Sequence, residues 1–308
     1  MKVAVIGYGN VGMAVFSAML QMREIQELVL VGRNQDKING ELSDYLDSLA
    51  VSDQKIKIGG GDYRNLKDAD IIVYAAGYSV KTTAQSRLDL IRDNIAVAKS
   101  VCGEINKYNK DGIIIVISNP VDPLTNAIRE FTGRPREKVI GTGTMLETAR
   151  LKRIVSELFD VRPADVQAYA LGEHGDSSFI VWSLVRILGM TLDEFLSLEI
   201  DALLNINKEE LIRVVHEAGF RIVENKGNTC YGVAAIASKI ASAIIFDTNE
   251  IMSVSETLEG EYGISGVAVS VPCLINRSGA HVIDHVPLEA SELDSLRASA
   301  EIVRRASN

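Results

Sequence analysis

Short, fully apolar runs alternate with longer amphipathic stretches along the first half of the chain. Residues 113–117, for example, are five β-branched residues in succession, which is typical of a strand covered on both faces of a sheet. The predicted strands cover residues 3–6, 28–31, 55–58, 70–75 and 113–117, and the predicted helices cover residues 11–22, 36–49 and 86–109. This alternation predicts an α/β fold with a doubly wound parallel sheet of the Rossmann type.

The second half of the chain predicts a different order of helices and strands. Its apolar periodicity predicts helices over 144–159, 209–225, 231–249 and 289–305, and antiparallel strands over 250–257 and 266–274. We therefore expect a boundary near residue 141, with a Rossmann domain over residues 1–141 and a second, α+β domain that binds substrate over residues 142–308.

The overall charge narrows the class of partner. The 308 residues carry a formal net charge of −9, which argues against nucleic acid or an anionic membrane as a partner. The three cysteines are widely spaced, and this predicts reduced thiols in a cytoplasmic protein rather than disulfides or a metal site. No apolar run reaches the length of a membrane span, and we expect no signal peptide.

A glycine-rich turn follows the first predicted strand. Gly7-Tyr8-Gly9-Asn10-Val11-Gly12 fits the pattern G-x-G-x-x-G and opens the first predicted helix. Gly7 permits the tight turn, Gly9 lets the backbone approach a pyrophosphate, and Gly12 lets the helix pack on the strand. Because the helix N-terminus also offers free N–H groups to an anion, the motif predicts dinucleotide binding.

The second strand departs from this pattern where it ends. An acid that binds the adenosine ribose hydroxyls is expected there, but the strand ends in Gly32-Arg33-Asn34. Gly32 would admit a 2′-phosphate and Arg33 would pair with it, so NADP is one hypothesis for the cofactor. The alternative is that Arg33 is solvated and NAD binds without the carboxylate.

Three polar elements could serve the reduction of a 2-oxo acid, which needs a proton donor, a cation for the carboxylate and a polarised ketone. His174 lies in a glycine-flanked turn and can donate a proton near neutral pH. Glu147 and Arg150 are three residues apart and share one helix face, so Arg150 could hold the carboxylate while Glu147 orients His174. Arg87 follows a polar loop and could close over the ligand.

Taken together, these segments resemble the L-lactate and malate dehydrogenase family. The matching stretches run in the family's order and cover residues 7–12, 75–77, 86–90, 117–122, 141–150 and 171–176. Residues 219–220 and 226–234 are most similar to the L-2-hydroxyisocaproate dehydrogenase branch.

The resemblance implies a role for each matching residue. His174 is similar to the family's proton donor and acceptor, Arg150 to its carboxylate-binding arginine, and Arg87 to the loop arginine that polarises the carbonyl oxygen. Asn119 is similar to an asparagine that bonds the substrate near the nicotinamide, and Thr229 to a threonine of the substrate pocket. The positions that approach the cofactor in the family are, in this chain, Val11, Gly77, Ser100 and Ser118.

Besides Gly32, two further departures from the family concern the chemistry. Glu147 replaces the usual aspartate beside the histidine. The segment between Gly77 and Arg87 is one residue longer than usual, so the specificity position is Val80 counted forward or Lys81 counted backward. An inward Val80 favours an apolar substrate such as 2-oxoisocaproate, whereas an inward Lys81 would bind a second carboxylate, as in oxaloacetate. An ammonium is a poorer carboxylate clamp than a guanidinium. We favour the apolar substrate, because the other close similarities point to the hydroxyisocaproate branch and Gly219 could leave room in the pocket.

These features predict an NAD- or NADP-dependent L-2-hydroxy acid dehydrogenase without a metal. The alternatives are a malate dehydrogenase that uses Lys81 and a dinucleotide-binding protein without catalysis. The resemblance also implies a homotetramer or a homodimer.

Overall fold

One continuous sheet of nine strands organises the molecule, of which the computed structural model describes residues 1–78, 87–198 and 207–307. Its strand order is β14-β13-β12-β6-β5-β4-β1-β2-β3. The first six strands along the chain are β1 (Lys2–Ile6), β2 (Glu27–Val31), β3 (Lys57–Gly61), β4 (Ile71–Tyr74), β5 (Ile113–Val116) and β6 (Val139–Gly141). These six strands are parallel to one another, and their order reverses beside β1 as in a doubly wound sheet.

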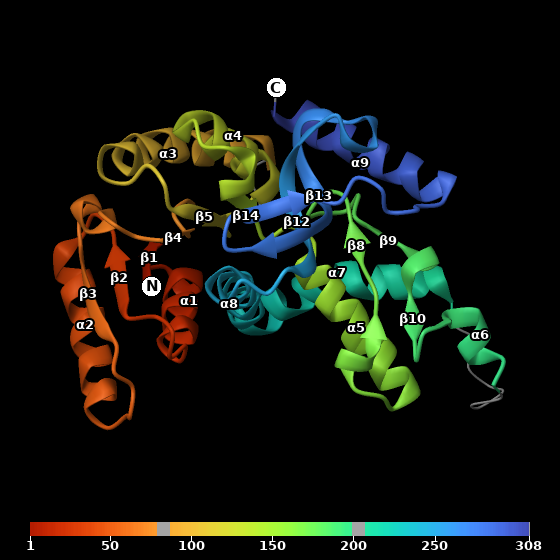
Figure 1. Ribbon diagram of the computed structural model, residues 1–308, viewed down its shortest axis with the longest axis horizontal. Coiled ribbons are helices and arrows are strands. Elements are labelled where there is room, and N and C mark those ends of the chain that lie inside the picture. Colours follow the sequence, from red (N-terminus) through yellow and green to blue (C-terminus); the bar gives the residue numbers. More distant parts are fainter. Residues whose placement is uncertain (79–86, 199–206, 308) are drawn as a thin grey trace.

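Helices cover both faces of these strands. They are α1 (Asn10–Leu20), α2 (Gln35–Ala50), α3 (Arg87–Tyr108) and α4 (Val121–Thr132). Ile113 and Ile115 of β5 join a core that also contains residues of α1 and α2, whereas Ile114 and Val116 join the core under α3 and α4 (Figure 1). This division follows from the two-residue period of a strand, and it explains why a run of five β-branched residues is needed here.

The second half of the chain extends the same sheet and adds a lobe beside it. Strands β12 (Glu250–Glu259), β13 (Ser265–Asn276) and β14 (Gly279–Val282) are antiparallel, and β12 pairs with β6 where Ser255 lies opposite Gly141. The helices are α5 (Met145–Phe159), α6 (Leu192–Leu196), α7 (Lys208–Lys226), α8 (Tyr231–Phe246) and α9 (Ala290–Ser307). Two small sheets contain β7 (Val166–Gln167), β8 (Ala170–Leu171), β9 (Phe179–Ile180), β10 (Arg186–Ile187) and β11 (Met190–Thr191).

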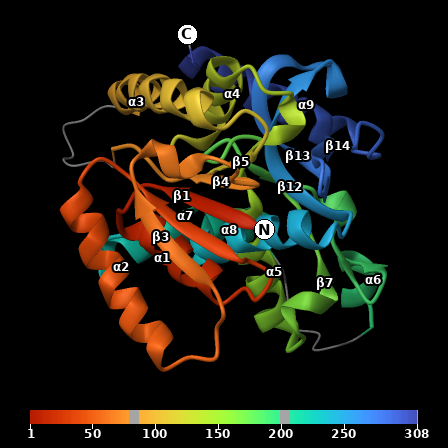
Figure 2. The same ribbon diagram turned by 60° about the vertical axis from the view of Figure 1, so that its left-hand side comes forward.

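Helix α8 connects the two halves. It packs against α1 on the same face of the sheet, and the residues Ile236, Ile240 and Ile244 lie in the core shared with β1 and β2 (Figure 2). The division at residue 141 therefore falls inside a sheet and between packed helices. The two-domain assignment stays a prediction.

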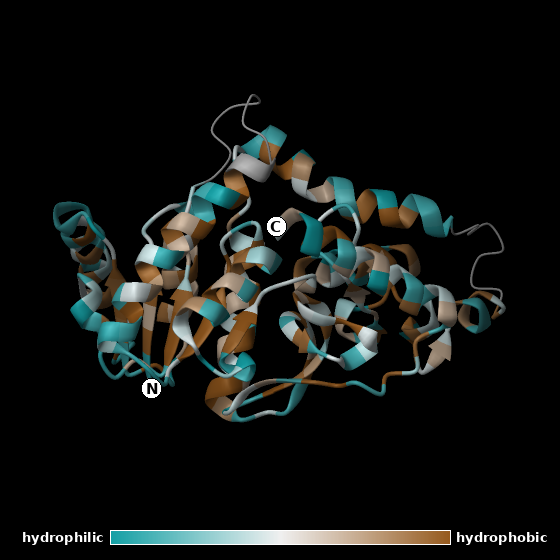
Figure 3. Cartoon of the chain, turned by 90° about the horizontal axis from the view of Figure 1, so that it is seen from above, coloured by the Kyte–Doolittle hydropathy of each residue, from teal (hydrophilic) through white to brown (hydrophobic). Residues whose placement is uncertain are grey.

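The predicted fold class is confirmed, and most predicted elements lie within a few residues of their position in the structure. The prediction was wrong at β3, which lies at 57–61 rather than 55–58. It missed the helices α4 and α6 and the strands β6, β10, β11 and β14. Figure 3 shows apolar strands between helices whose outward surfaces are polar. Within the described ranges, none of the helices is long and apolar enough to cross a membrane.

Candidate active site and cofactor groove

The glycines of the first turn differ in the space around them. A Cβ on Gly7 would lie 2.6 Å from the carbonyl oxygen of Ala75, and one on Gly12 would lie 2.1 Å from that of Gly7. Gly7 also has φ of +113°, which disfavours any other residue. By contrast, a Cβ on Gly9 would meet nothing within 4 Å, so the space beside its backbone is open to a ligand.

Helix α1 presents a free N-terminus to this space. Gly9 is its N-cap, no side chain caps it, and its first turn has no acidic residue. The first N–H groups of the helix therefore remain available to an anion, and the helix dipole favours one. The turn fits the pyrophosphate of a dinucleotide.

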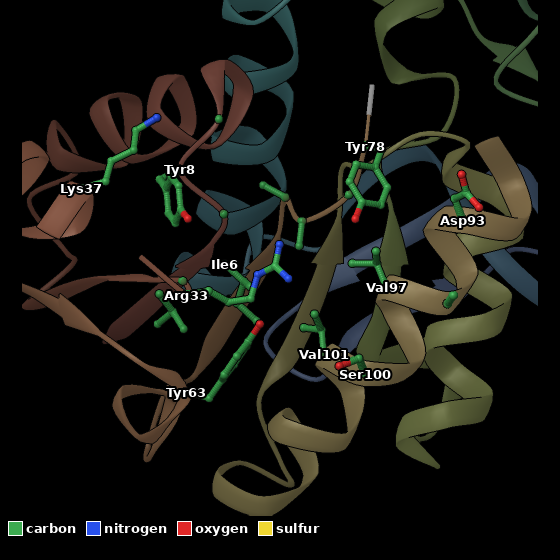
Figure 4. A pocket seen from close by; sticks show the side chains of 18 residues that line it. Ile6, Tyr8, Arg33, Lys37, Tyr63, Tyr78, Asp93, Val97, Ser100 and Val101 are labelled. Carbon is green, nitrogen blue, oxygen red and sulfur yellow. The ribbon is translucent and has the colours of Figure 1, made fainter. Parts of the chain in front are cut away.

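A groove of about 740 Å³ continues from this turn along the carboxyl ends of the parallel strands. Five of the predicted cofactor residues line it, namely Gly7, Gly9, Arg33, Gly77 and Ser100. Sequence reasoning missed other lining residues, which include Tyr8, Lys37, Tyr63, Tyr78 and Asp93 (Figure 4). A groove at the point where strand order reverses is the usual place for a dinucleotide in an open α/β sheet.

The other predicted cofactor residues stand outside the set of groove-lining residues. Val11 and the buried Gly12 lie in the first turn of α1. The Ser118 hydroxyl donates a hydrogen bond to the Ala76 carbonyl oxygen at 2.8 Å. Asn119 follows β5 and has an exposed side chain.

Asn94 of α3 ties the ends of two strands together. Its side chain accepts a hydrogen bond from the Tyr78 N–H at 2.7 Å and donates to the carbonyl oxygens of Tyr78, at 3.0 Å, and Asn119, at 2.7 Å. Its position close to Gly77 also leaves no room for a side chain there, because a Cβ would lie 2.9 Å from the amide oxygen. Asn94 thereby holds the backbone that precedes residues 79–86 next to Asn119.

The polar cluster of the second half forms around Glu147, which lies in the first turn of α5 and is 5% exposed. One carboxylate oxygen lies 3.1 Å from Nδ1 of His174, and the other accepts a hydrogen bond from Arg150 at 3.2 Å. The predicted His174–Glu147–Arg150 cluster is thus assembled in the structure. A single carboxylate bridges the imidazole and the guanidinium.

Charge sets the protonation of this cluster. Burial by itself would lower the pKa of His174, but the adjacent Glu147 carboxylate outweighs burial and raises that pKa above its ordinary value. Burial opposes ionisation of Glu147 as well, yet His174 and Arg150 together hold its pKa below the ordinary value. Each partner therefore favours the charged form of the other, which suits a histidine that must hold and deliver a proton.

The backbone of the His174 turn is fixed from two sides. The backbone N–H of His174 donates a hydrogen bond to the buried carboxylate of Asp122 at 2.7 Å. Gly172, two residues earlier, exchanges two backbone hydrogen bonds with Ser270 of β13. Gly172 has φ of +92°, and a Cβ there would lie 2.6 Å from the Ser299 hydroxyl oxygen, so only glycine fits. Asp122 ends the stretch 117–122 that resembles the family, but the sequence alone indicated no role for it.

The remaining predicted substrate residues are only partly described. Thr229 is half-buried between α7 and α8, and the chain of Arg87 begins α3, but its side chain lies outside the described residues, as do Val80 and Lys81. On α7, Gly219 faces the Arg150 guanidinium, since a Cβ on Gly219 would lie 3.3 Å from Nη2.

Comparison with known families decides the assignment. Residues 1–141 match the model of the lactate/malate dehydrogenase NAD binding domain, and residues 144–308 match that of the lactate/malate dehydrogenase alpha/beta C-terminal domain. The chain belongs to the lactate/malate dehydrogenase family. It is therefore an NAD-dependent oxidoreductase acting on a CH–OH group.

Similar proteins agree with this assignment over nearly the whole length of the chain. An L-lactate dehydrogenase of Clostridium perfringens is 39% identical over 303 residues, which are 98% of this chain and 95% of the relative. L-lactate dehydrogenase 1 of Clostridium acetobutylicum is 36% identical, with 98% and 96% covered. The structure of minor L-lactate dehydrogenase from Enterococcus mundtii, in a ligands-bound form, superposes with a TM-score of 0.93 at 32% identity and covers 99% of this chain and 97% of its own.

Proposed function

We propose that this family member interconverts L-2-hydroxy acids and 2-oxo acids whose side chains are small and uncharged, such as L-lactate or L-2-hydroxyisocaproate. The observation that carries the proposal is the Glu147 carboxylate held between His174 and Arg150. It combines a proton donor with a carboxylate-binding cation in one half-buried site. The names of the similar proteins, which are L-lactate dehydrogenases, support the same class of substrate.

The imidazolium of His174 is the proton donor in the reducing direction. Its Nδ1–H points to Glu147, so Nε2 is the nitrogen left to bond the substrate oxygen. In the oxidising direction the neutral imidazole takes the proton back. Glu147 stabilises the charged form and fixes the ring, which is the role of the carboxylate in a catalytic triad.

Arg150 binds the substrate carboxylate through its guanidinium fork. Its side chain is 12% exposed, so the ion pair with a substrate forms in a medium that screens charge weakly. In this proposal Arg87 polarises the ketone oxygen and Asn119 bonds the substrate, as the family resemblance implies. The nicotinamide supplies the hydride when it is bound, and the groove-lining residues hold the dinucleotide in place.

A substrate panel tests the proposal. The absorbance of the reduced nicotinamide is followed with pyruvate, 2-oxoisocaproate and oxaloacetate, each with NADH and with NADPH. We expect turnover with one or both of the uncharged substrates and little with oxaloacetate. Absence of turnover with all three would support the alternative of a dinucleotide-binding protein without catalysis.

The alternative of a malate dehydrogenase depends on Lys81. Single replacement of Val80 and of Lys81 by alanine separates the two substrates. If only Lys81→Ala has an effect, and if it abolishes oxaloacetate turnover, the proposal of an uncharged side chain is wrong. We expect instead that Val80→Ala changes the preference among uncharged 2-oxo acids.

We also infer a cytoplasmic homotetramer or homodimer. Exposed apolar side chains on α7 and at the start of α8, such as Phe220, Val223 and Tyr231, support an assembly of this kind. Light scattering of the gel-filtered protein measures its mass directly, and a mass of one chain would contradict the inference.

A further inference from the structure

The adenosine end of the groove differs from the NAD pattern in more than one residue. β2 ends at Val31, and the next position, where an acid would hold the ribose hydroxyls, is Gly32. A Cβ on Gly32 would lie 2.3 Å from Cε1 and 2.6 Å from Cδ1 of the Tyr8 ring. The ring of Tyr8 therefore occupies the space that any side chain at position 32 would need, and an acid cannot be placed there while Tyr8 keeps this position.

Two cations face the same end of the groove. Arg33 follows Gly32, and Lys37 lies one helical turn later, in the first turn of α2. The Lys37 ammonium lies 5.1 Å from the centre of the Tyr8 ring, and Figure 4 shows Tyr8 between Lys37 and Arg33, with Tyr63 beyond Arg33. Over residues 1–78, 87–198 and 207–307, neither cation forms an ion pair with a carboxylate, although both side chains are exposed.

The position of these two cations at one end of the groove, rather than the lack of an acid partner alone, points to a ligand. Many cations at the described surface, such as Arg64, Arg153 and Arg213, pair with a nearby acid, although some exposed cations do not. Here two unpaired cations, a missing acid and an aromatic ring that fills the acid's place meet at one end of a groove that fits a dinucleotide. A phosphate on the ribose 2′-oxygen supplies the negative charge that these cations lack.

We propose that Arg33 and Lys37, with the Tyr8 ring between them, form a subsite for the 2′-phosphate of NADP, and that Tyr8 prevents the NAD-type ribose acid. Arg33 forks onto the phosphate oxygens, and Lys37 supplies a second charge that Tyr8 holds in position. This inference rests on the proposed function for its nicotinamide chemistry, but the subsite can be tested without catalysis.

The first experiment uses two probes that differ only in the 2′-phosphate. Adenosine 2′,5′-bisphosphate and adenosine 5′-monophosphate are titrated calorimetrically into the full-length protein. We expect the bisphosphate to bind roughly ten to a hundred times more tightly, as two charge-assisted contacts allow. Equal affinity of the wild-type protein for the two probes overturns the subsite.

Three single variants identify the residues. Arg33→Ala and Lys37→Ala should each remove most of the difference between the probes, while the affinity for the monophosphate changes little. Lys57→Ala is the matched control, because it removes the same charge at the opposite, amino end of a strand, where Lys57 pairs with Glu27. The proposal is also overturned if Lys57→Ala weakens the bisphosphate as much as the two groove variants do.

A pair of variants tests the steric part. Gly32→Asp should clash with Tyr8 and lose thermal stability, whereas Tyr8→Ala/Gly32→Asp has space for the acid. The double variant should bind NADH more tightly than NADPH, measured by the fluorescence of the reduced nicotinamide. If Gly32→Asp alone is stable and switches the preference, Tyr8 does not control the position.

The outcomes separate this inference from the proposed function. If the protein discriminates the two adenosine probes but reduces no 2-oxo acid, the subsite is supported and the proposed function is wrong. If the protein reduces pyruvate with NADH but does not discriminate the probes, the proposed function is supported and the subsite is wrong.

Discussion

At the scale of single residues, the site depends on one carboxylate that serves two cations. Glu147 contacts both His174 and Arg150, and an aspartate at the same backbone position would reach about 1.5 Å less far. The extra methylene lets the acid span both partners from the first turn of α5. Binding of the substrate carboxylate to Arg150 and protonation of His174 are thus linked through Glu147.

Replacing this carboxylate should separate folding from catalysis. Glu147→Gln keeps the length of the side chain but removes the counter-charge, so we expect kcat to fall roughly a hundredfold or more. Because the carboxylate raises the pKa of His174, 2-oxo acid reduction should decline as pH rises through that pKa, and in the variant the decline should begin at lower pH.

The pH dependence of kcat in the reducing direction measures both effects, and circular dichroism checks the fold. Glu147→Asp is the matched variant that keeps the charge and loses reach. If Glu147→Gln has normal turnover and an unchanged pH profile, another group orients His174.

Asp122 acts on His174 through the backbone. Asp122→Ala removes the acceptor for the His174 N–H, and we expect kcat to fall about tenfold while the affinity for NADH stays the same. Asp122→Asn keeps an oxygen in the same place and should restore most of the activity. Steady-state kinetics and NADH titration distinguish this positioning role from a general loss of structure, because a loss of structure would lower both kcat and the affinity for NADH.

At the scale of elements, the turn between β1 and α1 separates a packing role from a binding role. Gly12→Ala puts a methyl group against the Gly7 carbonyl oxygen, so it should lower the free energy of unfolding by about 1–3 kcal/mol. In Gly9→Ala the new methyl group has no protein atom within 4 Å, so the free energy of unfolding should stay unchanged. The methyl group should nevertheless weaken NADH binding roughly tenfold or more.

Denaturant unfolding and NADH titration of both variants measure this contrast. Normal NADH affinity of a folded Gly9→Ala protein would show that the pyrophosphate does not approach this backbone.

Sequence patterns predicted the long elements well and the short or irregular ones poorly. β3 was displaced because three of its five residues are glycines, which have low strand propensity. α4 was missed, although Pro120 at its N-cap and Pro123 in its first turn are compatible with a helix start, where the missing N–H of proline has no partner. β6 has three residues and shows no period.

The site was predictable where spacing along one element sufficed. Glu147 and Arg150 share a helix face because they are three residues apart, and the glycine turn follows from its motif. Tyr8, Lys37, Asn94 and Asp122 were missed because their roles depend on contacts between distant elements. No local sequence pattern indicates that the Tyr8 ring lies against Gly32, or that the Asp122 carboxylate of α4 accepts a hydrogen bond from the His174 backbone.

At the scale of the whole molecule, the pairing of β12 with β6 makes the cofactor half and the substrate half parts of one sheet. Helix α8 strengthens this connection by packing on α1. We therefore expect a single cooperative unfolding transition of each folded chain, measured in denaturant by fluorescence and circular dichroism together. Transitions that do not coincide, with residues 1–141 unfolding separately, would contradict this.

Because the sheet is shared, a bound cofactor should also stabilise strands that lie away from its groove. A cofactor that binds only the folded groove lowers the population of every open state in which the groove is lost. β12 pairs with β6 and β13 pairs with β12, so we expect these strands to open together. Their backbone amides should then exchange hydrogen for deuterium more slowly when the dinucleotide is bound, although none of their residues lines the groove. The sheet would then report cofactor occupancy on the side of the molecule where the substrate is reduced.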